Sequence, residues 1–216
     1  MKKLDYFVKK DSRIKEVYDY AKEKYNKANL TQHNFEHVLR DLYRSLIIAE
    51  TEEGVNYFIL IPAVLLHDIG ATEGKYQNHE EIGVLIIKRD LPRLGYSKKE
   101  IGKIAHCVES HGGKIKPETI EAKILFDADK LEKSGIGGVF NFYRVQQESK
   151  TPMNEWIKRG IKRSQKFIKE GFYTKKAKEI SKNGFQERIK HFNKVMKSLK
   201  GRKDFLICEK DLWELK

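Results

Sequence analysis

The chain has 216 residues, of which 39% are hydrophobic and 35% are charged, and its formal net charge is +13 at pH 7. This length and composition suit one soluble domain with a substantial core, and no stretch approaches the roughly 20 apolar residues that cross a bilayer. Two cysteines, Cys107 and Cys208, are too few for a disulfide framework or a thiolate zinc site. We therefore expect a cytoplasmic protein that does not associate with membranes.

The positive charge is concentrated near the end of the chain. Residues 151–216 hold 19 Lys and Arg against 8 Asp and Glu, whereas residues 1–150 hold 25 against 23. We expect a near-neutral body over 1–150 and basic helices over 151–216 that pack on the same domain. A basic face attracts nucleic acid or anionic substrates, but a lysine-rich solvated surface is the interpretation we favour.

Apolar residues recur mostly at helical intervals, and strand patterns are scarce, so the sequence predicts an all-α fold. Thr31 is expected to cap one helix, and Ser97 with Glu100 forms the capping-box pattern of another. The segment Gly135–Gly138 predicts a flexible turn, and Phe205–Cys208 a short extended piece. The helices are expected over residues 3–28, 31–53, 55–68, 79–91, 97–111, 117–133, 139–148, 151–170 and 174–200.

The run Ala63–Gly70 ends an apolar helix with two residues that commonly bind metals, His67 and Asp68. Burying both side chains without partners costs a few kcal/mol each, and a divalent cation is the simplest compensation. Two further residues of these types, His37 and Asp129, lie on other predicted helices. Asp129 is flanked by apolar residues, where an unpaired carboxylate is costly. Together the four residues predict a metal site.

The chain from about His33 to Phe142 resembles the HD-domain superfamily of metal-dependent phosphohydrolases, most closely its small stand-alone members. The resemblance implies a compact multi-helix HD-domain bundle over 1–150, with an additional basic C-terminal helical segment over 151–216. The motifs that carry it are His37–Arg40, Ala63–Gly70, His79–Gly83, Ile104–His111 and Pro117–Glu132.

By this resemblance His37, His67, Asp68 and Asp129 bind the metal. Asp127 is a competing choice for the last ligand. We favour Asp129, because the family's ligand is usually followed by a basic or polar residue that faces the site, and here this residue is Lys130.

The resemblance also bears on the remaining histidines. His79 and His111 match positions where some family members place extra histidines, for a second metal or for contact with phosphate, although purely structural roles are an equal alternative. His106 is the less favoured relative of His111. No Gly-Tyr-Pro signature follows these histidines, so the cyclic-dinucleotide phosphodiesterase branch is not supported. The lack of a synthetase or regulatory domain argues against a bifunctional alarmone enzyme.

Two histidines and two carboxylates suit Mn²⁺, Fe²⁺, Co²⁺, Ni²⁺ or Mg²⁺, and the histidines favour a transition metal over Mg²⁺. The ion would activate water to attack a phosphate ester or phosphoanhydride, and a nucleotide is the substrate we favour. Asp68 is expected to orient this water. Lys130, Arg40 and Lys75 are candidates to neutralise phosphate oxygens, although each also has a solvated-surface interpretation.

A non-enzymatic function is the competing hypothesis. The basic segment would then bind nucleic acid and the metal site would be structural only. Aromatic residues lie between its lysines, but at helical spacing they are more typical of a core than of base stacking. A third possibility keeps the enzyme and uses this segment as a lid or a dimer surface, so oligomers are possible. The aromatic residues are Trp156, Phe167, Phe172, Tyr173, Phe185 and Phe192.

Overall fold

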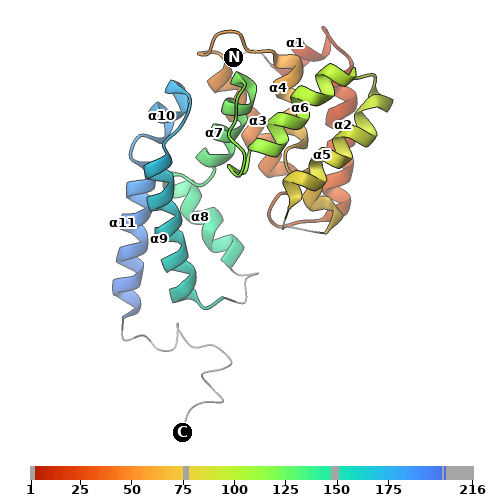
Figure 1. Cartoon of the computed structure of the whole chain (residues 1–216). Coiled ribbons are helices and arrows are strands. Elements are labelled where there is room, and N and C mark those ends of the chain that lie inside the picture. The colour runs from red at the N-terminus through yellow and green to blue at the C-terminus, as the bar shows by residue number, and fades with distance from the viewer. Residues whose placement is uncertain (1–2, 75–77, 147–150, 201, 203–216) are drawn as a thin grey trace. The chain divides into compact units, whose positions relative to one another are not determined.

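The computed structural model describes residues 3–74, 78–146, 151–200 and 202, and within these ranges it contains helices and no strand (Figure 1). The expected all-α fold is therefore confirmed. The chain divides into two compact units, which are described separately below. Unit 1 comprises residues 1–130 and 173–177, and unit 2 comprises 131–172 and 178–216.

Contacts place the boundary between the units at residues 130 and 131, whereas the charge pattern predicts a boundary near residue 150. The two boundaries differ because the charge pattern reflects the solvated surface, whereas the division into compact units reflects packing in the core. That the basic helices pack on the same domain stays a prediction. The expected extended piece Phe205–Cys208 lies outside the described residues.

Unit 1 is a bundle of α-helices with two short 3₁₀ segments. The segment expected as one helix over 3–28 is two helices, since residues 9–12 do not continue the first one. In chain order the elements are α1 (Leu4–Val8), α2 (Arg13–Ala28), α3 (Phe35–Ala49), α4 (Tyr57–Leu66), η1 (Ile69–Glu73), α5 (His79–Asp90), η2 (Leu91–Leu94), α6 (Lys98–Ser110) and α7 (Ile120–Leu131).

The helix caps agree with the sequence at one of the two predicted positions. Ser97 and Glu100 form a complete capping box at the start of α6, as expected. Thr31 does not cap α3. Instead Asn34 caps it, and the Asn34 side chain accepts a hydrogen bond from the His37 N–H at 2.9 Å. The capping asparagine thereby fixes the first turn of the helix that carries His37.

Helix α4 is the central element of unit 1. Every residue from Ile59 to Leu66 is buried, and α4 packs against α2, α3 and α6. Its uniformly apolar sequence fits this position, because a helix without a polar face must be covered on all sides. The residues that follow α4, His67 and Asp68, are consequently delivered into the interior, where both are at most 1% exposed.

Gly70 allows α5 to lie directly against the end of α4. A Cβ atom at this position would lie 2.0 Å from the carbonyl oxygen of His79 and 2.6 Å from the nitrogen of Gly83. Only glycine permits such a close approach of two backbones. The approach brings the first residue of α5, His79, beside His67 and Asp68.

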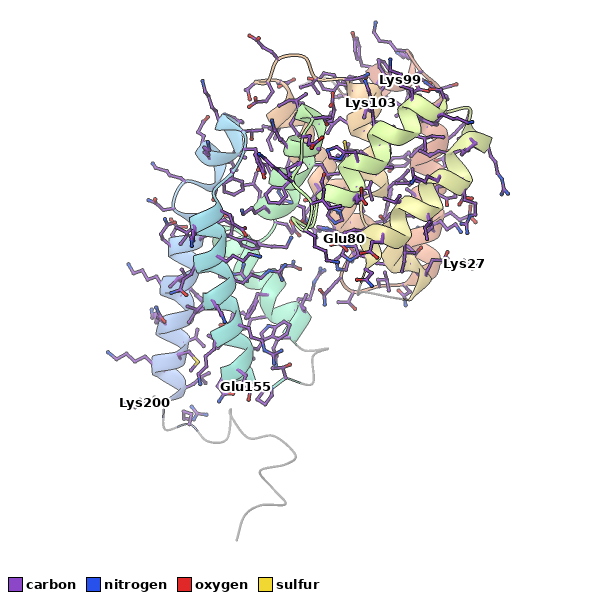
Figure 2. All side chains as sticks on the ribbon, in the orientation of Figure 1. Lys27, Glu80, Lys99, Lys103, Glu155 and Lys200 are labelled. Carbon is purple, nitrogen blue, oxygen red and sulfur yellow. The ribbon has the colours of Figure 1, made fainter. Side chains whose placement is uncertain are left out.

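The described part of unit 2 contains three long helices, and α9 and α11 pack together along their length. Figure 2 labels Glu155 near the start of α9 and Lys200 after the end of α11, at the same end of the unit, so the two helices run antiparallel. The glycine-rich segment predicted as a turn is instead the first turn of α8. The long helices are α8 (Gly135–Gln146), α9 (Met153–Glu170) and α11 (Gly184–Leu199). The short helix α10 (Lys175–Ser181) is divided between the units, because residues 175–177 belong to unit 1.

The aromatic residues of unit 2 form its core. Phe185 and Phe192 are 3% and 0% exposed, and the Phe142 and Phe192 rings pack with centroids 4.6 Å apart. Arg188 is buried among them, with its guanidinium near the Phe142 and Phe192 rings. Burial, with a contribution from the nearby Arg163, lowers the pKa of Arg188 to about 10. The core interpretation therefore holds for Phe185 and Phe192, whereas Tyr173 is 41% exposed.

Within the described ranges, no helix combines the length and the apolar composition that a membrane span requires.

Candidate functional site

The first part of the site lies on α3, where His37 and Asp41 are one helical turn apart and share a face. Both are buried, with exposures of 7% and 0%. The Nε2 atom of His37 lies 3.3 Å from Oδ2 of Asp41. The other Asp41 oxygen, Oδ1, accepts a hydrogen bond from Arg44 at 2.8 Å. Sequence reasoning missed Asp41, although its position four residues after His37 was a usable signal.

The second part follows α4. Nδ1 of His67 lies 2.8 Å from the carbonyl oxygen of Val64. Because a carbonyl only accepts, Nδ1 carries the proton, and the Nε2 lone pair of the neutral imidazole points into the site. This Nε2 lies 3.2 Å from Nε2 of His37 and 3.1 Å from Oδ2 of Asp68. His37 Nε2 is also 3.2 Å from that oxygen.

The third part comes from the start of α5 and the end of α6. His111 repeats the arrangement of His67, since its Nδ1 lies 2.6 Å from the carbonyl oxygen of Val108. Its Nε2 therefore also faces the site, 3.3 Å from Oδ1 of Asp68. Nε2 of His79 lies 3.1 Å from the same oxygen. Asp68 thus directs Oδ2 toward His37 and His67, and Oδ1 toward His79 and His111.

His33 adds a further imidazole that sequence reasoning did not assign. Its Nδ1 lies 2.5 Å from Oδ2 of Asp68, and its side chain is 25% exposed. The backbone of His33 has a φ of +48°, in the left-handed region that non-glycine residues seldom occupy. The turn before α3, and not helical spacing, brings this side chain to the site. The sequence alone therefore gave no periodic signal for it.

Asp129 and Asp127, the two choices for the last predicted ligand, lie in different surroundings. Oδ1 of Asp129 is 3.7 Å from Nε2 of His37. Asp127 accepts hydrogen bonds from the backbone of Tyr173 at 3.0 Å and from the backbone and hydroxyl of Thr174, both at 2.7 Å. Asp129 is the one that lies beside the imidazoles, while Asp127 holds the segment before α10.

The surrounding charges shift the pKa values of the buried groups. Burial would raise the pKa of Asp68, but the nearby imidazoles of His33 and His67 outweigh it and hold that pKa well below its usual value. Burial raises the pKa of Asp41, and the His37 imidazole only partly offsets this. Burial disfavours the charged form of His67, yet the Asp68 carboxylate more than compensates and raises its pKa.

The donor atoms of this site suit a divalent cation. Two buried carboxylate oxygens, Oδ2 of Asp41 and Oδ1 of Asp68, have no hydrogen-bond donor. The Nε2 atoms of His37, His67, His79 and His111 face them across 3.1 to 3.6 Å. Where Nδ1 carries the proton, as in His67 and His111, a further proton or a cation must separate Nε2 from the carboxylate oxygen. The groups whose ligand atoms lie within 4.8 Å of one another are His37, Asp41, His67 and Asp129; His33, Asp68 and His79; and His67, Asp68 and His111.

The other predicted residues lie in varied places. Lys130 is 2% exposed, and its ammonium lies 5.0 Å from the centroid of the Phe126 ring. Arg40 is half-buried on α3. His106 accepts a hydrogen bond from the backbone N–H of Glu118 at 3.1 Å, which is a structural role. Lys75 lies outside the described residues.

Beside His79, the buried carboxylate of Glu80 forms an ion pair with the exposed Lys114. Glu80, labelled in Figure 2, is 6% exposed and lies 3.3 Å from the ammonium of Lys114, whose side chain is 56% exposed. Its Oε2 is also 3.6 Å from Nδ1 of His79. A Cβ at Gly112 would lie 2.1 Å from Oε1 of Glu80, so a larger residue there would displace this carboxylate. The pair was not predicted, because the residues are 34 positions apart.

A separate cavity of about 290 Å³ opens at the turn between α2 and α3. It contains none of the histidines and aspartates described above, so it is distinct from their cluster. It is lined by Tyr25, Asn26, Asn29, Leu30, Asn34, Phe35 and Glu36.

Residues 34–134 match the family model of the HD domain. This region of the chain is an HD domain. The match covers α3 to the end of α7 and therefore contains every residue of the cluster except His33. The expected resemblance to the HD-domain superfamily is confirmed.

Two curated relatives are similar over part of the chain. A bifunctional uridylyltransferase/uridylyl-removing enzyme of Ruegeria pomeroyi is 37% identical over 73 residues, which is 33% of this chain and 8% of that protein. Ribonuclease Y of Symbiobacterium thermophilum is 33% identical over 92 residues, which is 42% of this chain and 16% of that protein. The chain thus spans less than a fifth of the length of either relative.

Solved structures share the fold over most of the chain. A predicted HD superfamily hydrolase from an uncultured Thermotogales bacterium has a TM-score of 0.60 and 20% identity, over 85% of this chain and 91% of that one. YpgQ of Bacillus subtilis, in complex with ADP, has a TM-score of 0.67 and 18% identity, over 87% and 95%. A protein of Lactobacillus plantarum has a TM-score of 0.70 and 16% identity, over 88% and 98%. These identities support a shared fold alone.

Proposed function

We propose that the protein is a metal-dependent phosphohydrolase that cleaves a phosphate ester or phosphoanhydride of a nucleotide. The observation that carries the proposal is the convergence of buried imidazoles and carboxylates from separate helices inside an HD domain. The names of the relatives, which describe uridylyl removal and a ribonuclease, and the ADP complex of YpgQ support a nucleotide substrate.

The residues proposed to hold the cation are His37, His67, Asp68 and Asp129. Their Nε2 and carboxylate oxygen atoms face one another at 3.1 to 3.7 Å. A bound divalent ion such as Mn²⁺, Fe²⁺, Co²⁺, Ni²⁺ or Mg²⁺ would lower the pKa of water and offset charge that develops on the phosphoryl group.

Asp68 is suited to two tasks because its oxygens face different neighbours. Oδ2 lies with the imidazoles of His37 and His67. Oδ1 lies between His79 and His111, where it can accept a hydrogen bond from the attacking water and orient it. That water forms the new bond to phosphorus as the bond to the leaving oxygen breaks. His79 and His111 would contact phosphate oxygens or, as the alternative, hold a second cation.

Cationic side chains near the cluster would neutralise phosphate oxygens. Lys114 is exposed, and Glu80 tethers it beside His79, so it joins the predicted Lys130, Arg40 and Lys75 as a candidate. Its location at the rim suits a phosphate group further along a polyphosphate chain.

The proposal is tested with metal-loaded protein and a panel of nucleoside mono-, di- and triphosphates. The variant Asp68→Ala should lose at least about a thousandfold in rate, since it removes both a ligand of the ion and the group that orients the water. The matched control is Asp19→Ala, because Asp19 pairs with Lys15 on the exposed face of α2. Full activity in Asp68→Ala, or no turnover of any phosphate ester by the unaltered protein, would remove this function.

The competing function, binding of nucleic acid without catalysis, has the basic surface of α9 in its favour. Lys158, Lys162, Lys166 and Lys169 are all exposed on this helix. Two of the aromatic residues that would stack on bases, Phe185 and Phe192, are buried, however, and this weakens the hypothesis. Binding to mixed-sequence RNA that falls steeply with salt, without turnover, would support it.

A further inference from the structure

The carboxylate of Asp41 is buried in the cluster and only half satisfied. Asp41 is 0% exposed. Its Oδ1 accepts a hydrogen bond from Arg44 at 2.8 Å, which orients the carboxylate plane, while its Oδ2 has no hydrogen-bond donor. A buried carboxylate oxygen without a partner is strongly unfavourable. Oδ2 of Asp41 therefore requires a positively charged or hydrogen-bonding partner.

The position of Oδ2 matches that of a ligand atom. Ligands at adjacent corners of an octahedron, about 2.1 Å from the ion, lie about 3 Å apart. Oδ2 of Asp41 is 3.3 Å from Nε2 of His37 and 3.6 Å from Nε2 of His67. Those two nitrogens are 3.2 Å from each other. The distances from Asp41 Oδ2 to the two imidazole nitrogens are therefore close to those between ligands of one ion.

The negative charge of the carboxylates near His37 also favours a cation in this site. Asp41, Asp68 and Asp129 all approach His37 Nε2, at 3.3, 3.2 and 3.7 Å. Three carboxylates that converge in a buried site repel one another strongly. Arg44 pairs with Oδ1 of Asp41, whereas Oδ2 is the oxygen that faces His37. A divalent ion between the three would convert the repulsion into attraction.

We propose that Asp41 is a fifth protein ligand of the cation, so that the site presents three carboxylates and two imidazoles. The inference rests on the metal dependence proposed above. A donor set rich in carboxylate oxygen favours Mn²⁺, Fe²⁺ or Mg²⁺ over ions that prefer nitrogen and sulfur. Asp41 thereby makes the centre more selective for oxygen-preferring ions than two histidines and two aspartates alone would.

The test compares Asp41→Asn with Asp127→Asn in protein stripped of metal with a chelator. Both substitutions remove one charge from a fully buried aspartate of unit 1, and the asparagine at position 41 can still accept from Arg44. Calorimetric titrations with Mn²⁺ and Zn²⁺ give the affinities. Thermal unfolding, followed by circular dichroism with and without metal, gives a readout that does not depend on activity.

For Asp41→Asn we expect an Mn²⁺ affinity about tenfold or more below that of the unaltered protein, with a smaller loss for Zn²⁺. Its metal-free form should unfold at a higher temperature than the unaltered protein, because the repulsion among the carboxylates is relieved. A purely structural role would lower that temperature. Asp127→Asn should keep both affinities and unfold at a lower temperature.

An unchanged Mn²⁺ affinity in Asp41→Asn would overturn the assignment of Asp41. So would a lowered unfolding temperature of its metal-free form together with an unchanged response to metal. These outcomes are distinct from failure of the proposed function, in which the unaltered protein binds metal tightly but hydrolyses no phosphate ester.

Discussion

The variant Asp127→Ala tests whether Asp127 has a structural role on α7 or binds the metal. The Asp127 carboxylate accepts three hydrogen bonds, from the backbone of Tyr173 and from the backbone and hydroxyl of Thr174. These bonds join α7 to residues 173–177, which are far away in the chain but part of the same unit. The substitution should therefore reduce stability and leave metal binding intact.

The size of the effect follows from the donors that lose their acceptor. Thr174 is 2% exposed, so its N–H and hydroxyl would be left buried, at about 1–3 kcal/mol each. Tyr173 is 41% exposed, so water can satisfy its N–H. Burial raises the pKa of Asp127, which shows that its charge is incompletely compensated and reduces the loss. We expect about 3 kcal/mol, or a fall of roughly 10 °C in Tm.

The assay is urea unfolding of metal-free protein, followed by circular dichroism, with calorimetric titration of Mn²⁺ beside it. Asp129→Ala is the matched variant, because its carboxylate lies 3.7 Å from His37 Nε2. It should lose metal affinity with little loss of metal-free stability. Loss of Mn²⁺ affinity in Asp127→Ala with an unchanged free energy of unfolding would refute the reasoning and make Asp127 the ligand.

Three further perturbations probe other contacts. Gly70→Ala should destabilise unit 1 by several kcal/mol and weaken metal binding, because the Cβ would overlap the α5 backbone; an unchanged Tm would contradict this close approach. Arg13 lowers the pKa of Glu100 to about 2 from 4.5, so this contribution to stability is present above pH 4.5 and lost as the pH falls toward 2. Glu100→Gln should accordingly flatten the fall in Tm over that range, and an unaltered pH profile would argue against the ion pair. Lys114→Gln should raise KM for nucleoside triphosphates severalfold more than for monophosphates. Lys116→Gln, a change at an exposed neighbour, is the control and should leave KM unchanged. Equal KM values in the two variants would exclude Lys114 from substrate binding.

Several features could be read from residues near one another in the chain. The uniformly apolar run before His67 predicts a central helix, and α4 is that helix. The spacing of Ser97 and Glu100 predicts the capping box of α6. These predictions succeed because helix periodicity and capping depend on neighbours within about four residues.

Other features depended on contacts that no local pattern encodes. Thr31 carries a good capping side chain, but the turn with positive φ at His33 delays α3 until Asn34. The glycines near residue 135 begin α8 instead of forming a turn. In both places packing overrides the intrinsic preference of the residues.

The amino-acid sequence by itself determined the helices, the HD motifs and the types of side chain that can hold a cation, because these follow from periodicity and from residue chemistry. The tertiary structure alone decided which donors meet. It brought His33 and Asp41 to the cluster, turned Asp127 toward Thr174, and joined Glu80 to Lys114 across 34 residues. The physical reason is that distances between helices depend on how the whole core packs around α4.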